Sequence, residues 1–362
     1  MSSEKSCCCS AGSCCGTESI TVYDKNDKWI TGEIRTFRGS VPVVSTNLNF
    51  KDKLGAWKVR WGIGRMNYKI NPGLYAIGKP GHKSPVLVSA NYKLTFDVLR
   101  KELSGLDCWI LILDTKGINV WCAAGKGTFG TDELVSRISK IGLTDIVSHR
   151  KLVLPQLGAT GVNAHEVAKQ TGFSVVYGPV RAKDIKAFLD SGFKATEEMR
   201  TVKFSTRDRL VLTPMELVTA AKSSLMVFGV MFLLNLFAAR PFGLADLIAY
   251  VGAVLAGTVL TPLLLPVIPG RAFAWKGWLV GLVWTLAFIW YSGLFVPGFL
   301  LPAIGYLLVL PSLSAYLAMN FTGSSTYTSF SGVIKEMKIA MPLIAISSAA
   351  GVVMLLINCI RV

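Results

Sequence analysis

Charged residues are scarce beyond Glu216. Nine remain there: Lys222, Arg240, Asp246, Arg271, Lys276, Lys335, Glu336, Lys338 and Arg361. The apolar stretches between them cover residues 217–239, 244–268, 278–295, 298–319 and 339–360, and each can cross a hydrocarbon layer of about 30 Å. Buried helices of a water-soluble protein would need some polar surface, so the missing charge excludes that arrangement. The sequence predicts an all-α transmembrane domain of five helices over residues 217–362.

Histidine is almost absent as well. The chain has three, His82, His149 and His165, and none lies in an Asp-x-His-x-x-Gly loop. The cysteine spacings of iron–sulfur clusters and the paired Cys-x-x-Cys of structural zinc sites are also missing. A thiolate is therefore the strongest candidate for a metal ligand in the folded part of the chain.

Cysteine is concentrated at one end. Five of the eight cysteines lie in the first fifteen residues: Cys7, Cys8, Cys9, Cys14 and Cys15. Their Ser- and Gly-rich surroundings predict a disordered tail over residues 1–19, and a reducing compartment argues against disulfides. Reduced thiols prefer soft metal ions, so capture of such an ion is one interpretation. An idle or redox-sensitive tail is the alternative.

Net charge predicts how the chain is oriented. The chain carries +16, of which +11 precedes residue 217, but its basic residues are spread without an aromatic-rich module, which excludes nucleic acid as the expected partner. With residues 1–216 in the cytoplasm, inside loops carry Arg271, Lys276, Lys335 and Lys338, and outside segments carry only Arg240 and Arg361. We expect a multi-pass protein of the cytoplasmic (inner) membrane, with a basic juxtamembrane linker over residues 201–216.

The apolar pattern of residues 20–200 predicts an α/β domain with Rossmann-like layers. Short apolar strands are expected at 86–89, 109–113, 151–154 and 173–176, and helices at 95–103, 132–141, 165–171 and 182–189, with Thr95 as a helix cap. This alternation favours a parallel sheet covered by helices. Residues 20–76 are expected to form a small mixed lobe. Ligands bind at the carboxyl ends of such strands, so residues 116–130 are the first place to look.

A single cysteine, Cys122, lies among small residues in that segment. Residues 119–126 read Asn-Val-Trp-Cys-Ala-Ala-Gly-Lys, with Cys122 in the middle. Small neighbours would let a bulky flat ligand approach the backbone. A lone cysteine after a buried strand is more often a small apolar filler.

The same segment also matches the motif of a dinucleotide-binding site. Gly125, Gly127 and Gly130 satisfy Gly-x-Gly-x-x-Gly and precede an expected helix. The preceding strand should run straight into the first glycine, and here the Trp121–Cys122 pair intervenes. A membrane-anchored NAD-dependent oxidoreductase is therefore kept as an alternative function.

Residues 119–126 closely resemble the signature of the mercury-methylating corrinoid proteins, the HgcA family, in which a short helix presents a cysteine to the corrinoid. Residues 71–75 and 84–93 look like the corrinoid domain of the corrinoid iron–sulfur protein large subunit. The resemblance covers residues 41–362 and includes the multi-span C-terminus. The Cys-rich start of the chain departs from the family pattern.

The resemblance implies a corrinoid-dependent methyltransferase that passes a methyl group from a methyl–cobalt intermediate to inorganic Hg(II), giving methylmercury. A cobalamin-type corrinoid would be the cofactor, and the Cys122 thiolate would be the catalytic residue and lower axial ligand of cobalt. The cofactor-binding face would comprise Asn119, Val120, Trp121, Cys122, Ala123, Ala124, Gly125 and Lys126. The five tail cysteines would be candidates for Hg(II) capture.

The family also implies partners. Cobalt must return to Co(I) after transfer, and this chain lacks a cluster motif, so a ferredoxin-like iron–sulfur protein is expected as electron donor and Hg(II) carrier. A methyl-donating folate or a corrinoid methyltransferase system of anaerobic one-carbon metabolism would load the methyl group. A corrinoid methyl carrier with another acceptor is the second alternative. A transporter is disfavoured, because the spans carry little charge to bind an ion.

Overall fold

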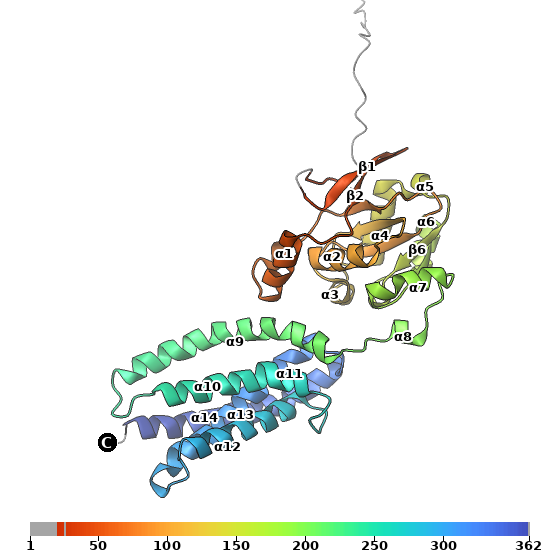
Figure 1. The fold of residues 1–362 in the computed structure, drawn as a ribbon. Coiled ribbons are helices and arrows are strands. Elements are labelled where there is room, and N and C mark those ends of the chain that lie inside the picture. Colours follow the sequence, from red (N-terminus) through yellow and green to blue (C-terminus); the bar gives the residue numbers. More distant parts are fainter. Residues whose placement is uncertain (1–19, 25–26, 361–362) are drawn as a thin grey trace, which may run out of the picture. The chain divides into compact units, whose positions relative to one another are not determined.

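The computed structural model describes residues 20–24 and 27–360, which divide into two compact units (Figure 1). One comprises the chain up to Trp57 together with Gly64–Thr201, and the other comprises Lys58–Ile63 and Val202–Val362. The Cys-rich tail and its predicted metal capture lie outside the described residues.

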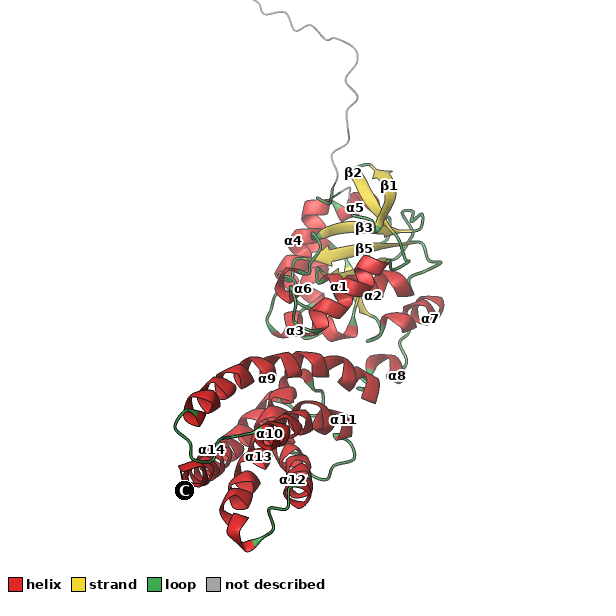
Figure 2. Ribbon diagram, turned by 60° about the vertical axis from the view of Figure 1, so that its left-hand side comes forward, coloured by secondary structure: helices red, strands yellow, loops and turns green. Residues whose placement is uncertain are grey.

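The first unit is built on one mixed sheet, whose seven strands in the described residues have the order β1-β2-β3-β5-β4-β6-β7 (Figure 2). The strands are β1 (Ile30–Thr36), β2 (Gly39–Val44), β3 (Gly73–Ile77), β4 (Val86–Ala90), β5 (Cys108–Leu113), β6 (Lys151–Leu154) and β7 (Ser174–Tyr177). β4 pairs in parallel with β5 and β6, and β6 with β7. β3 runs antiparallel to β5 and parallel to β2, and β1 runs antiparallel to β2.

Helices cover both faces of this sheet, because the central strands are buried on both sides. The helices of this unit are α1 (Phe50–Arg60), α2 (Lys93–Glu102), α3 (Val120–Gly125), α4 (Thr131–Ile141), α5 (Leu143–Ile146), α6 (Ala164–Thr171), α7 (Ile185–Asp190) and α8 (Glu197–Arg200), with 3-10 turns η1 (Arg65–Asn67), η2 (Gln156–Gly158) and η3 (Ala182–Asp184). One core joins α3, α4, α5 and α6 to the sheet, and the other joins α2 and α7 to its opposite face.

The predicted α/β architecture is confirmed, with three local corrections. Residues 20–76 contribute β1, β2 and β3 to the same sheet and are not a separate lobe, so the sheet is mixed. Thr95 is not the cap of α2, which begins at Lys93 after Tyr92. The expected helix at 182–189 is divided into η3 and α7. Strand direction and pairing depend on contacts across the sheet, which a single pattern along the chain does not reveal.

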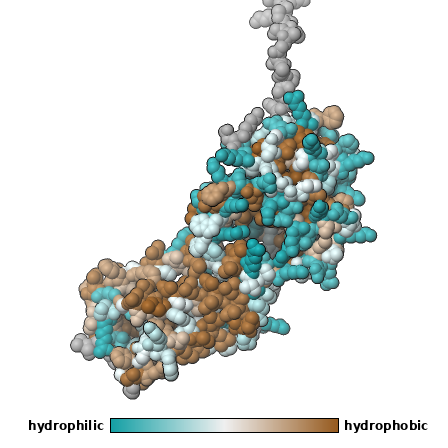
Figure 3. Space-filling view, in the orientation of Figure 1, coloured by the Kyte–Doolittle hydropathy of each residue, from teal (hydrophilic) through white to brown (hydrophobic). Residues whose placement is uncertain are grey.

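The second unit is helical, and its described residues contain five helices long and apolar enough to span a membrane, as predicted. These spans are Thr206–Asn235, Leu244–Leu264, Phe273–Tyr291, Leu300–Ser324 and Ser331–Ile360. Their elements are α9 (Thr206–Asn235), α10 (Leu244–Leu255), η4 (Ala256–Leu260, a π-helical turn), α11 (Thr261–Leu264), α12 (Phe273–Tyr291), η5 (Pro297–Phe299), α13 (Leu300–Asn320), η6 (Phe321–Ser324) and α14 (Phe330–Ile360). Figure 3 shows hydrophobic side chains over most of the visible surface of this unit.

Small residues let these helices pack closely. A Cβ added to Gly277 would lie 2.6 Å from the Ser314 carbonyl oxygen, and one added to Gly281 would lie 2.6 Å from the Ser314 Cβ. α12 and α13 therefore touch along nearly bare backbone, as is common between membrane helices. α9 begins at Thr206, so most of residues 201–216 is helical.

Candidate functional site

α3 follows β5 at the carboxyl edge of the parallel strands and carries Cys122 near its start. Asn119 is the N-cap residue of α3, and its side-chain oxygen accepts a hydrogen bond from the Cys122 backbone N–H at 2.9 Å. An asparagine in this position satisfies a backbone donor that the helix itself leaves unpaired. The side chain of Asn119 therefore determines where the thiol-bearing turn begins.

The two faces of α3 differ in burial. Val120, Ala123 and Ala124 are buried against the core, whereas Cys122 is exposed and Trp121 is 41% exposed. This alternation follows the helical period of 3.6 residues. Burying one face attaches the helix to the sheet and leaves the thiol on the outer face.

Asn91 holds the loop that leads into α3. It is 2% exposed at the end of β4, and its side-chain oxygen accepts hydrogen bonds from Thr115 N and Oγ1 and from Gly117 N, at 2.9 to 3.1 Å. Its amide nitrogen donates to Asp114 Oδ1 at 3.1 Å. Lys116 (φ 59°) and Gly117 (φ 74°) both adopt left-handed backbone conformations in this loop. One buried amide therefore shapes the turn between strand and site.

Asp114 adds a second constraint. Partial burial acts to raise the pKa of the Asp114 carboxyl, but hydrogen bonds from the backbone and side chain of Lys116 outweigh it and hold the pKa below its usual value. Asp114 also donates its backbone N–H to Glu133 Oε1 at 2.9 Å, which links the loop to α4. Asp114 thus connects the start of this loop to Lys116 and to α4.

Close backbone packing supports α3 from the side. A Cβ on Gly161 would lie 2.2 Å from the Phe129 carbonyl oxygen and 3.0 Å from Ala124 Cα, and a Cβ on Gly158 would lie 2.5 Å from the Phe129 ring. Phe129 is fully buried, and its N–H donates to the Ala123 carbonyl at 3.1 Å. The glycines after β6 therefore let this segment lie against α3.

Gln156 lies in η2, in the same segment. Its side-chain oxygen is buried without a hydrogen-bond partner among the described residues. An unpaired buried acceptor is costly and points to a strained or ligand-dependent site. Sequence reasoning missed Asn91, Gly158 and Gly161, because each acts through residues distant in the chain. It also missed Gln156, because the burial of its oxygen is decided only by the fold.

Cys108 and His149 have packing and hydrogen-bonding roles in the fold. Cys108 is fully buried in β5, and burial raises the pKa of its thiol to about 12. The His149 ring contacts the Ser84 carbonyl and the Lys151 N–H, and the His82 carbonyl accepts from Ser148. No group of three or more His, Cys, Asp or Glu side chains that could hold a metal occurs in the described part of the chain. Cys122 is the exposed thiol of the α/β unit as described.

The glycines of the dinucleotide fingerprint do not follow a strand. Gly125 ends α3, and Gly130 directly precedes α4. A loop and the whole of α3 therefore separate β5 from the first glycine, whereas the fingerprint requires a direct strand-to-glycine turn. All eight predicted cofactor-face residues, from Asn119 to Lys126, lie in α3 and its two caps.

Comparison with known proteins gives a likeness for this unit. Residues 64–189 match the family model described as the CO dehydrogenase/acetyl-CoA synthase delta subunit. Subunit gamma of the acetyl-CoA decarbonylase/synthase complex of Methanopyrus kandleri is 34% identical over 124 residues, which are 34% of this chain and 26% of that protein. The α/β unit is related to these subunits.

A second relative bears on the expected resemblance. The corrinoid/iron-sulfur protein large subunit of Moorella thermoacetica is 29% identical over 122 residues, which are 33% of this chain and 27% of that protein. The expected likeness to such a large subunit is confirmed for the α/β unit. The chain spans about a quarter of the length of these relatives, and the resemblance to mercury-methylating proteins stays a prediction.

Proposed function

We propose that this chain is a membrane-anchored corrinoid methyl carrier in which the Cys122 thiolate is the lower axial ligand of cobalt. The observation that carries the proposal is the exposed thiol of Cys122 on α3, at the edge where α/β sheets bind ligands. The related subunits support the cofactor, since one of them is named for its corrinoid.

The residues around Cys122 fit a large, flat ligand rich in amides. Added Cβ atoms on Gly125 and Gly127 would meet nothing within 4 Å, so the backbone here is open to close approach. The unpaired oxygen of Gln156, in the turn beside α3, is the kind of acceptor that the carboxamide groups of a corrinoid can supply with a donor. Asn119 would hold the thiol in place, and Trp121 would cover part of the same face.

Hg(II) is the acceptor that we propose. A corrinoid held by the Cys122 thiolate would supply methyl-transfer chemistry. Transfer of its methyl group to Hg(II) as a carbanion equivalent would give methylmercury, and two electrons would then be needed to restore Co(I). Thiolate donation from Cys122 favours an electrophilic acceptor, because it increases electron density on the metal. A ferredoxin-like iron–sulfur protein would supply the electrons and carry Hg(II), and a folate or corrinoid methyltransferase system would supply the methyl group. The basic surface of the chain suits an acidic partner.

The spans support an anchoring role. Asp246 is the acid of the second span, and its side chain accepts a hydrogen bond from Gly243 N at 2.7 Å at the start of α10. Tyr306 donates to the same carboxylate. These contacts occupy Asp246 within the bundle, which favours an anchor over an ion pathway.

The decisive test is the absorption spectrum of the anaerobically purified full chain. In Cys122→Ala and Cys122→Ser we expect the spectrum of the bound corrinoid to change and methylmercury formation to be lost. Cys108→Ala is the matched control, because it removes a buried thiol on the opposite core, and it should keep both signals. Normal methylation of mercury by both Cys122 variants would refute the ligand role.

Two other functions remain distinguishable. If the Cys122 variants change the corrinoid spectrum but the unmodified chain forms no methylmercury, the protein is a corrinoid carrier with another methyl acceptor. Nicotinamide binding in a titration of the purified chain would favour the oxidoreductase, although α3 interrupts its fingerprint.

A further inference from the structure

α1 presents an apolar stripe to the surface of the α/β unit. Phe50 is 78% exposed, Leu54 37% and Trp57 55%, and Trp61 directly follows the helix. The spacing of four, three and four residues places these side chains on one face of a helix. Exposed aromatic residues in such a row indicate an interaction surface.

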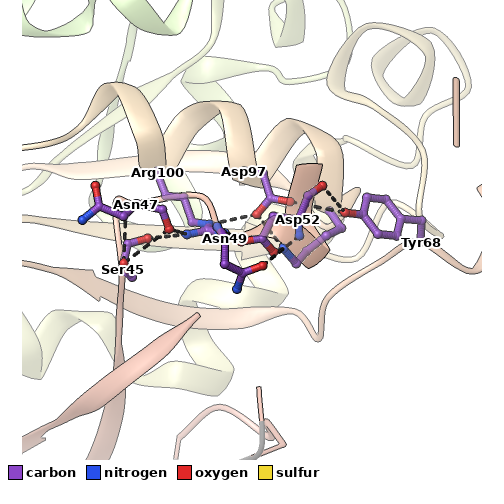
Figure 4. Close-up of polar contacts among 8 residues, drawn as sticks. Ser45, Asn47, Asn49, Asp52, Tyr68, Asp97 and Arg100 are labelled. Atoms are coloured by element: carbon purple, nitrogen blue, oxygen red, sulfur yellow. Dashed lines mark hydrogen bonds and ion pairs between the residues drawn. The ribbon is translucent and has the colours of Figure 1, made fainter. Parts of the chain in front are cut away.

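The opposite face of α1 is held by a buried ionic network (Figure 4). Asp52 contacts Arg100 Nη2 at 2.6 Å and Lys93 Nζ at 3.0 Å, and both cations belong to α2. Asp97 pairs with the same two cations. This face of α1 therefore packs against α2. The apolar stripe lies about half a turn away from it.

The start of α1 is fixed by the same network. The Asn49 side chain accepts from Asp52 N at 2.9 Å, and the Asp52 side chain accepts from Asn49 N at 3.1 Å. This reciprocal arrangement is a capping box. Close packing follows one turn later, because a Cβ on Gly55 would lie 2.5 Å from the Tyr68 hydroxyl oxygen. The orientation of the stripe relative to α2 is thus well defined.

The end of α1 belongs to the membrane unit. Residues Lys58–Ile63 group with the helical unit, and a Cβ on Gly62 would meet Met215 and Val218 of α9 at 3.6 and 3.7 Å. Trp61 lines a groove with Leu217, Val218 and Lys222, at the beginning of the first apolar stretch. Trp61 thus continues the spacing of the stripe one residue beyond the end of α1.

Basic residues flank the stripe on both sides. Lys51 and Lys58 lie on one side and Lys53 and Arg60 on the other, and the three lysines are exposed. Exposed lysines beside exposed aromatic side chains give this surface a charge that is complementary to anionic phospholipid.

We propose that α1 is an interfacial helix that lies on the anionic phospholipid surface, with Phe50, Leu54 and Trp57 in the headgroup region. The exposed lysines on both sides of the stripe favour an anionic lipid surface over a protein partner, through charge complementarity. The ionic network would then couple α2, and with it the α/β unit, to the membrane surface. This inference does not depend on the cofactor or on the methyl acceptor.

Site-specific photocrosslinking of the full chain tests it. A diazirine-bearing phenylalanine replaces Phe50 or Trp57, one at a time, and the protein is reconstituted in vesicles of phosphatidylglycerol and phosphatidylcholine. Phe37, which is 99% exposed in the turn between β1 and β2, carries the same probe as a matched control. Because position 50 is also largely exposed, its substitution should not disturb folding.

We expect several-fold more lipid adduct, measured by mass spectrometry, at positions 50 and 57 than at position 37. Adduct yield should also fall when phosphatidylglycerol is omitted. Equal yields at the three positions would overturn the proposal. Protein adducts in place of lipid adducts at positions 50 and 57 in native membranes would also overturn it, since a partner protein would then occupy the stripe.

Discussion

At the residue scale, asparagine side chains cap the N-termini of two helices in the α/β unit. Asn119 caps α3 through Cys122 N, and Asn163 caps α6 through His165 N and Glu166 N. Asn119→Ala and Asn163→Ala should each lower the free energy of unfolding by about 1 kcal/mol, measured by urea titration of the detergent-solubilised chain. Only Asn119→Ala should alter the spectrum of the bound corrinoid, because only Asn119 positions the thiol. An unaltered spectrum would show that the cap does not position Cys122.

Residues in the site differ in how far their roles could be foreseen. Cys122 and its small neighbours are contiguous, so a local pattern predicts them. Asn91 lies more than twenty residues before the loop that it holds, and Gly161 acts on the Phe129 backbone. Such roles require a fold before they exist, since each consists of a contact between separate segments.

At the scale of elements, the packing of α3 against the segment after β6 can be tested with glycines. Gly161→Ala should lower the free energy of unfolding by about 1–3 kcal/mol, because its Cβ would overlap Phe129 O. Gly125→Ala is the matched control, since its Cβ meets nothing within 4 Å. The control should fold normally and, if a ligand covers α3, should retain less corrinoid. Equal stability of the two variants in a urea titration would contradict this packing.

The link between α1 and α2 has a defined pH dependence. Burial acts to raise the pKa of Asp52, but its hydrogen bond with Lys93 and the charges of Lys93 and Arg100 hold the pKa below the usual value. A carboxyl with a lowered folded-state pKa stabilises above its unfolded pKa of about 3.9, and loses that contribution as the pH falls through the lower folded-state value.

Removal of the Asp52 charge should therefore loosen α1 at neutral pH. Asp52→Asn leaves Arg100, which is fully buried, with less compensation, and should lower the free energy of unfolding by about 3–5 kcal/mol. Hydrogen exchange of residues 50–60 should accelerate in this variant, while that of α4 and α6 should change little. Asp145→Asn, which breaks an exposed pair with Arg38, is a control with little expected effect.

At the scale of the whole molecule, charge predicts topology. If all five candidate spans cross the membrane, the two ends of the helical unit lie on opposite sides of it, and the basic loops predict a cytoplasmic α/β unit. An alkaline phosphatase fused after Val362 should be active and a fluorescent protein fused there dark. The reverse result would invert the orientation and contradict the cytoplasmic chemistry proposed here.

The sequence by itself determined the apolar character of the second unit, its five candidate spans and the four strands that pair in parallel. These depend on composition and on patterns between near neighbours, which a linear chain already contains. Only the tertiary structure decided that β1, β2 and β3 complete the same sheet, that Asn91 and Gly161 hold α3, and that α1 turns an apolar stripe outward while Asp52 is buried with Arg100. Each of these depends on contacts between distant segments, whose partners exist only after the chain has folded.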